Sequence, residues 1–163
     1  MAELISSMNW KQIVVYLIAT SLLIIGLSQF SFLTDIELTQ LIAKKETIRG
    51  LENSGERLTL LLVWTAVLSV VGLVISGLIM FQLTRKIKYY WINMLTVLLL
   101  GHLATRFELF YANPVKEVTL FFGGLFSQLG PLYPYLINGV FLTGLGLLIF
   151  YNKWTDKLVL RVQ

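Results

Sequence analysis

The chain has 163 residues, of which 56% are hydrophobic and 13% are charged, and its formal net charge is +4. Soluble domains carry about 25% charged residues, and a soluble chain of this length could not bury so much apolar surface. The composition therefore excludes an ordinary soluble globule and a disordered chain, and it predicts an integral membrane protein.

The first predicted element is a membrane-spanning helix over residues 12–34, a stretch without Asp, Glu, Lys or Arg. A helix needs about 20 apolar residues to cross the hydrocarbon core of a bilayer. The apolar core of this stretch is longer than that of a typical cleaved signal peptide, and no small-x-small cleavage motif follows it. We interpret it as an uncleaved signal anchor.

The segment 35–57 is the only sizeable polar stretch of the chain. Leu38, Leu41 and Ile42 lie near one face of a helix, and residues of opposite charge follow at helical spacing, as in Glu46 and Arg49. We predict a short amphipathic helix on the extracytoplasmic side of the membrane. It would either rest on the lipid headgroups or dock a partner protein.

Three further spans are predicted over residues 58–84, 89–110 and 132–152. Gly130 and the prolines 131 and 134 separate the last span from the apolar residues before it, because proline interrupts a helix. The segment 114–131 is therefore interpreted as interfacial or re-entrant, and residues 153–163 as a tail. The predicted fold class is an all-α bundle of four transmembrane helices forming one domain over 1–163.

The positions of the charges predict the orientation of the bundle. Seven basic and two acidic residues lie in the segments 1–11, 85–88 and 153–163, whereas six basic and seven acidic residues lie in 35–57 and 106–117. The positive-inside rule places the first group, with both termini, in the cytoplasm. The basic residues thus serve orientation in the bilayer, so we expect no nucleic-acid partner and a location in the cytoplasmic membrane.

The aromatic residues predict the same orientation independently. Tryptophans 10, 91 and 154, which are three of the four in the chain, all lie at the predicted cytoplasmic interface. Tyrosine and tryptophan are enriched at membrane–water interfaces because their rings are amphipathic.

Three polar residues within the spans are candidates for a ligand site or for contacts between helices: His102, Arg106 and Asn138. Counting helical rise from the ends of their spans places His102 and Asn138 at a similar depth in the outer leaflet, with Arg106 one turn beyond His102. Such a layer could join helices by hydrogen bonds while Arg106 extends to the headgroups. It could instead bind a lipid, a quinone, an ion or another substrate.

Catalytic and cofactor signatures are missing from the sequence. The chain has no cysteine and one histidine, whereas membrane cytochromes of the b type use two haem-ligating histidines, so we considered haem at His102 and predict none. HExxH, GxSxG and phosphate-binding glycine motifs are absent. We therefore predict no catalytic residues, no metal site and no cofactor.

Small residues at i, i+4 spacing predict close helix packing. They are Gly72 with Ser76 in the second span and Gly139 with Thr143 in the fourth. Small residues let helix backbones approach one another in a membrane, either within one chain or between chains.

These observations predict a small non-catalytic subunit with four spans, serving an accessory, anchoring or assembly role in a larger membrane complex. Its expected partners are the lipid bilayer, other membrane subunits or further copies of itself. The alternative is a small oligomeric transporter or channel, or a lipid- or quinone-binding protein, whose polar site lies near the outer leaflet.

Overall fold

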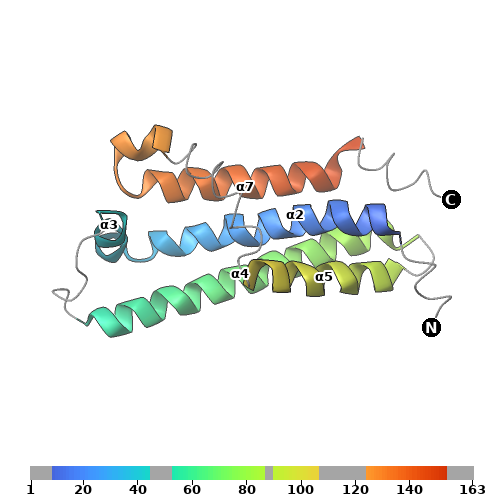
Figure 1. The fold of residues 1–163 in the computed structure, drawn as a ribbon, viewed down its shortest axis with the longest axis horizontal. Helices are drawn as coiled ribbons and strands as arrows, with labels where there is room; N and C mark the ends of the chain where they lie inside the picture. Colours follow the sequence, from blue (N-terminus) through green and yellow to red (C-terminus); the bar gives the residue numbers. More distant parts are fainter. Residues whose placement is uncertain (1–8, 45–52, 87–89, 107–123, 154–163) are drawn as a thin grey trace.

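In the computed structural model (Figure 1), residues 9–44, 53–86, 90–106 and 124–153 are described. Their regular structure is entirely helical. The helices are α2 (Trp10–Gln29), the 3-10 turn η1 (Phe30–Leu33), α3 (Ile36–Lys44), α4 (Ser54–Thr84), α5 (Tyr90–Arg106), the 3-10 turn η3 (Ser127–Leu129) and α7 (Tyr133–Tyr151). The prediction of an all-helical chain is confirmed for these residues.

Three helical stretches are long and apolar enough to cross a membrane: Trp10–Leu33, Ser54–Thr84 and Tyr133–Tyr151. At about 1.5 Å of rise per residue, α4 with its 31 residues is about 46 Å long. The remaining predicted span corresponds to α5, an apolar helix of 17 residues. The predicted continuation of this span over 107–110 lies outside the described residues.

A regular series of hydrogen bonds from hydroxyl side chains to backbone carbonyls accompanies the end of α2. The side chain of Ser28 donates to the carbonyl of Ile25, that of Ser31 to Ser28, and that of Thr34 to Ser31, at 2.7–2.8 Å. Each bond bridges three residues, which suits the tighter winding of a 3-10 helix. The predicted span 12–34 therefore ends in a 3-10 turn instead of a continuous α-helix.

The two described parts of the polar segment 35–57 belong to two different helices. Asp35 begins α3, since its carboxylate accepts a hydrogen bond of 3.0 Å from the backbone N–H of Leu38, as N-cap residues do. The helix runs to Lys44, residues 45–52 lie outside the described part, and α4 already begins at Ser54. Glu56 and Arg57 thus belong to the first turn of α4, one turn before the predicted span.

Two other predicted segments are described only in part. Of the segment 114–131, residues 124–131 are described and include η3, while 114–123 are not. Leu125 and Leu129 have exposed side chains. Of the predicted tail 153–163, only Lys153 is described.

Helix α2 is central: α7 packs on one side of it and α4 and α5 on the other (Figure 1). Residues 19–26 of α2 are all buried. Consecutive long helices run in opposite directions, so the start of α2 and the end of α7 lie at the same end of the molecule. We call this the terminal end, and the end that carries α3 the distal end.

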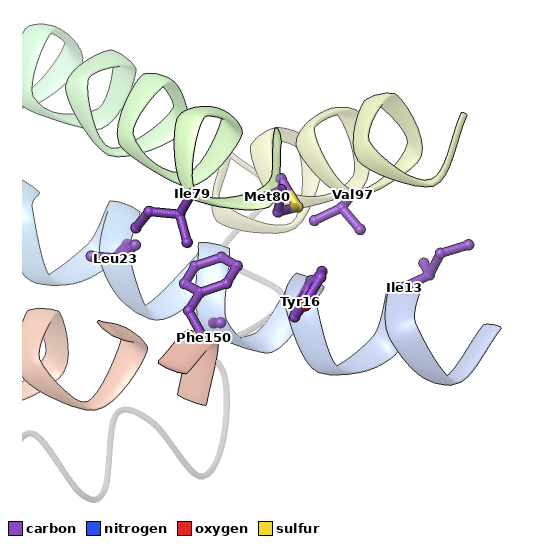
Figure 2. Packing of buried hydrophobic residues seen from close by; sticks show 8 residues of the cluster. Ile13, Tyr16, Leu23, Ile79, Met80, Val97 and Phe150 are labelled. Atoms are coloured by element: carbon purple, nitrogen blue, oxygen red, sulfur yellow. The ribbon is translucent and has the colours of Figure 1, made fainter. Parts of the chain in front are cut away.

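A cluster of buried apolar side chains joins all four long helices (Figure 2). Its members are Ile13, Tyr16, Ala19 and Leu23 of α2, Ile79 and Met80 of α4, Val97 of α5 and Phe150 of α7. Phe150 points from α7 toward α2, where its ring centroid lies 5.2 Å from that of Tyr16. Half of the cluster comes from α2, so the first span supplies much of the interior.

Close backbone contact between α2 and α7 is possible only because both helices carry glycine there. A Cβ atom built on Gly26 would lie 2.6 Å from the backbone nitrogen of Thr143, and one built on Gly139 would lie 3.1 Å from the carbonyl oxygen of Gly26. A Cβ atom built on Gly72 of α4 would likewise lie 3.0 Å from the Cα atom of Ile24 on α2. Glycine therefore sets the spacing between α2 and two of its neighbours.

Candidate functional site

Two residues of the predicted polar layer, His102 and Asn138, lie on helices that pack on different sides of α2. His102 lies on α5 with an exposed side chain, and Arg106 is the last residue of that helix. Asn138 is buried on α7, which packs on the opposite side of α2 from α5 (Figure 1). Counting residues along a helix predicts the depth of a side chain in the bilayer but not the direction in which the side chain faces.

Asn138 itself has an unusual environment. Its residue surface is 8% exposed, and its Oδ1 atom accepts no hydrogen bond from the part of the chain that the structure describes. The buried hydroxyl of Thr143 on the same helix also lacks a described partner. A buried amide oxygen without a donor costs free energy, so Oδ1 of Asn138 is a candidate for a hydrogen bond from outside the described residues.

A buried amide cluster joins α2 and α5 at the terminal end. The side-chain Nδ2 of Asn93 donates to Oε1 of Gln12 at 3.0 Å, and the backbone N–H of Asn9 donates to Oδ1 of Asn93 at 3.3 Å. Asn9 also caps α2, accepting from the backbone N–H of Gln12 at 3.1 Å. Both Gln12 and Asn93 are more than nine-tenths buried. The cluster fixes the start of α5 against the start of α2.

Hydroxyl groups join the distal end of α2 to α4. The Oγ of Ser31, which is fully buried, lies 2.8 Å from Oγ1 of Thr65. The hydroxyl of Thr39 on α3 donates to the carbonyl of Phe32 at 2.6 Å. The ring of Phe32 stacks on that of Tyr135 at a centroid distance of 4.3 Å. Residues 31–32 therefore contact α3, α4 and α7 together.

An ionic cluster attaches α3 to the beginning of α4. Arg57 donates to both carboxylate oxygens of Asp35 at 2.5 Å and to Glu37 at 2.9 Å. The hydrogen bonds from Arg57 lower the pKa of Asp35 below its ordinary value of 3.8, with help from the N–H of Leu38. An open hollow is lined by Asn53, Glu56, Arg57 and Leu60 beside this cluster.

Three of the small residues singled out in the sequence lie against α2, and the fourth is buried. Gly72 contacts Ile24, Ser76 is fully buried on α4, and Gly139 and Thr143 contact Gly26. Gly26, the partner of Gly139 and Thr143 on α2, has Leu22 and Phe30 four residues before and after it, so no small-residue spacing marks it in the sequence.

The polar clusters at the two ends were not predicted, although part of their signal was present. Asn9 three residues before Gln12 and Asp35 before an amphipathic stretch are typical of helix N-caps. The partners Asn93 and Arg57 are 81 and 22 residues away from Gln12 and Asp35, respectively. No local pattern indicates pairs so distant in the sequence.

These arrangements connect helices; they do not assemble reactive groups. No group of three or more His, Cys, Asp or Glu side chains that could hold a metal ion occurs within the described ranges. We compared the chain with protein-family models, with curated proteins and with solved structures, and none of the three comparisons gave a match.

Proposed function

We propose that the chain is a small non-catalytic subunit of a larger membrane protein complex, with an accessory, anchoring or assembly role. The observation that carries the proposal is the uneven burial of the apolar helices. Within the most apolar 18-residue stretch of each helix, 61% of the residues are buried in the first span, Trp10–Leu33, but only 11% are buried in α4. One helix organises the interior, while α4 presents a long apolar surface to lipid or to other subunits.

The same proposal includes four spans in one domain, both termini in the cytoplasm, and α3 on the extracytoplasmic side of the cytoplasmic membrane. The alternating directions of the helices and the apolar character of α5 support the four spans. The central position of α2 supports an uncleaved signal anchor, because its removal would remove half of the main apolar cluster.

The chain has no cysteine, so single cysteines introduced at Lys11 and Lys44 would report sidedness without background labelling. Labelling of both from one side of the membrane would refute this topology.

The subunit proposal is tested by extracting the protein with a mild detergent and measuring its mass under native conditions. We expect one or more different proteins to remain bound in a fixed stoichiometry, and these to be retained in a second detergent. A stable monomer that carries no other protein in either detergent would contradict the proposal.

Asn138 favours a second candidate function, an oligomeric transporter or channel, or a lipid- or quinone-binding protein. A ligand or a neighbouring copy could supply the hydrogen-bond donor that Oδ1 lacks among described residues. Flux or ligand binding in proteoliposomes should then fall in Asn138→Ala. Activity that is unchanged by His102→Ala, Arg106→Ala and Asn138→Ala would remove the proposed polar site.

A further inference from the structure

Among the described residues, the acidic side chains lie at one end of the molecule, where Arg57 pairs with two of them, and four basic residues lie at the other end. The terminal end carries Lys11 at the start of α2, Arg85 and Lys86 at the end of α4, and Lys153 after α7. All four have exposed side chains, and none forms an ion pair with another described residue. All described acidic residues, Asp35, Glu37 and Glu56, lie at the distal end.

Exposed aromatic side chains accompany these cations. Trp10, Trp91 and Tyr151 are each at least half exposed, and each lies within the first two or last residues of its helix at the terminal end. Amphipathic rings of this kind lie at the depth of the lipid headgroups. The cations next to them would then lie at the level of the lipid phosphates, where long side chains extend from the helix ends.

We propose that the terminal end is a binding surface for anionic phospholipids, formed by Lys11, Arg85, Lys86 and Lys153 around the exposed aromatic residues. The proposal rests on the chain spanning a membrane, as proposed above. A zwitterionic headgroup brings no net charge to offset these four cations, whereas each anionic lipid brings one net negative charge. Attraction of this type corresponds to at most about fivefold local enrichment of anionic lipid for each engaged cation.

Tryptophan fluorescence gives a direct readout of the lipid in contact with each end. Three variants would each retain one tryptophan, at 10, 91 or 64, with phenylalanine at the other positions. Trp64 is exposed on α4 and lies about 30 Å along that helix from Thr84, so it serves as the matched control. Each variant is reconstituted in symmetric vesicles of about 80% phosphatidylcholine and 20% phosphatidylglycerol, with either lipid brominated as a quencher.

We expect brominated phosphatidylglycerol to quench Trp10 and Trp91 about two- to fivefold more, per mole of brominated lipid, than brominated phosphatidylcholine does. The excess should disappear at high salt and in the variant that carries Gln at all four cationic positions. It should persist when Lys11, Lys86 and Lys153 are replaced by Arg, or when Lys44 at the distal end becomes Gln. Trp64 should be quenched equally by both lipids.

The outcomes separate failure of this proposal from failure of membrane insertion. If neither brominated lipid quenches Trp64, the chain does not span the bilayer and the proposed function fails first. If Trp64 is quenched but Trp10 and Trp91 show no preference for phosphatidylglycerol, the anionic-lipid surface is refuted. A preference that survives both high salt and the four Gln substitutions also refutes it. Because the salt experiment uses unaltered cations, it does not depend on how well the Gln variant folds.

Discussion

The side chain of Asn93 donates a 3.0 Å hydrogen bond to that of Gln12, and both amides are buried between α2 and α5. Where water is scarce, each amide is costly without the other. The pair therefore does more than add one bond, since it opposes every arrangement of α5 that separates the two groups.

Breaking this pair should destabilise the helical bundle. We expect Asn93→Leu, which is close in volume, to lower the free energy of unfolding by about 1–2 kcal/mol, because Gln12 is left without its donor. The double variant Gln12→Met/Asn93→Leu should cost less than the sum of the single variants. Denaturation in detergent measures all three, and Gln82→Met, at an exposed position of α4, is the neutral control. Additive losses would show that the pair is not coupled.

The contact between α2 and α7 predicts opposite effects for two glycine substitutions. Gly26→Ala should lower stability by about 1–3 kcal/mol, since its Cβ would lie 2.6 Å from the backbone of Thr143 and the helices would have to separate. Gly144→Ala, on the outer face of α7 with nothing within 4 Å of the added atom, should be neutral or slightly stabilising because alanine favours helix. Equal thermal stability of the two variants would show that this glycine contact is unimportant.

The sequence predicts the positions of the helices better than the contacts between residues that are distant in the chain. Long charge-free stretches mark α2, α4 and α7 to within a few residues, because a bilayer tolerates few charges and requires helices. The earlier start of α4 was missed because Arg57 is stabilised by Asp35, a partner that the local sequence does not reveal. The sequence likewise suggests a similar depth for His102 and Asn138 but not the sides of α2 on which their helices pack.

Asp35 predicts a dependence of stability on pH. The pKa of this carboxyl is lowered in the folded state, mainly by the hydrogen bonds from Arg57. Its contribution is therefore complete above the unfolded-state value of about 3.8 and is lost as the pH falls through the lower folded-state value. The stability difference between the unaltered chain and Asp35→Asn should be constant near neutral pH and should shrink below about pH 4. A difference that stays constant down to about pH 2 would contradict the assignment.

A second substitution at Asp35 separates its two roles. Asn keeps the ability to cap α3 but loses the charge that attracts Arg57, whereas Ala loses both. We expect Asp35→Ala to be less stable than Asp35→Asn by about 1 kcal/mol, the usual contribution of an N-cap side chain. Equal stabilities would mean that the bond to Leu38 contributes little.

Two asparagines are buried among the described residues, and the one respect in which they differ distinguishes the proposed functions. Asn93 has its partners within the bundle, whereas Oδ1 of Asn138 has none among the described residues. Replacing an unsatisfied buried polar group by an apolar one of the same shape is neutral or stabilising. Asn138→Leu should therefore leave the isolated chain at least as stable as before, in contrast to Asn93→Leu.

The same substitution should nevertheless weaken any contact that completes the hydrogen bonding of Asn138. If that contact is a partner subunit, the complex extracted in mild detergent should lose the partner in Asn138→Leu while the chain itself stays folded. If it is a transported or bound small molecule, the complex should persist while flux or binding falls. A loss of stability in the isolated chain as large as that of Asn93→Leu would show that Asn138 already has its donor within the bundle, and neither role would then follow from it.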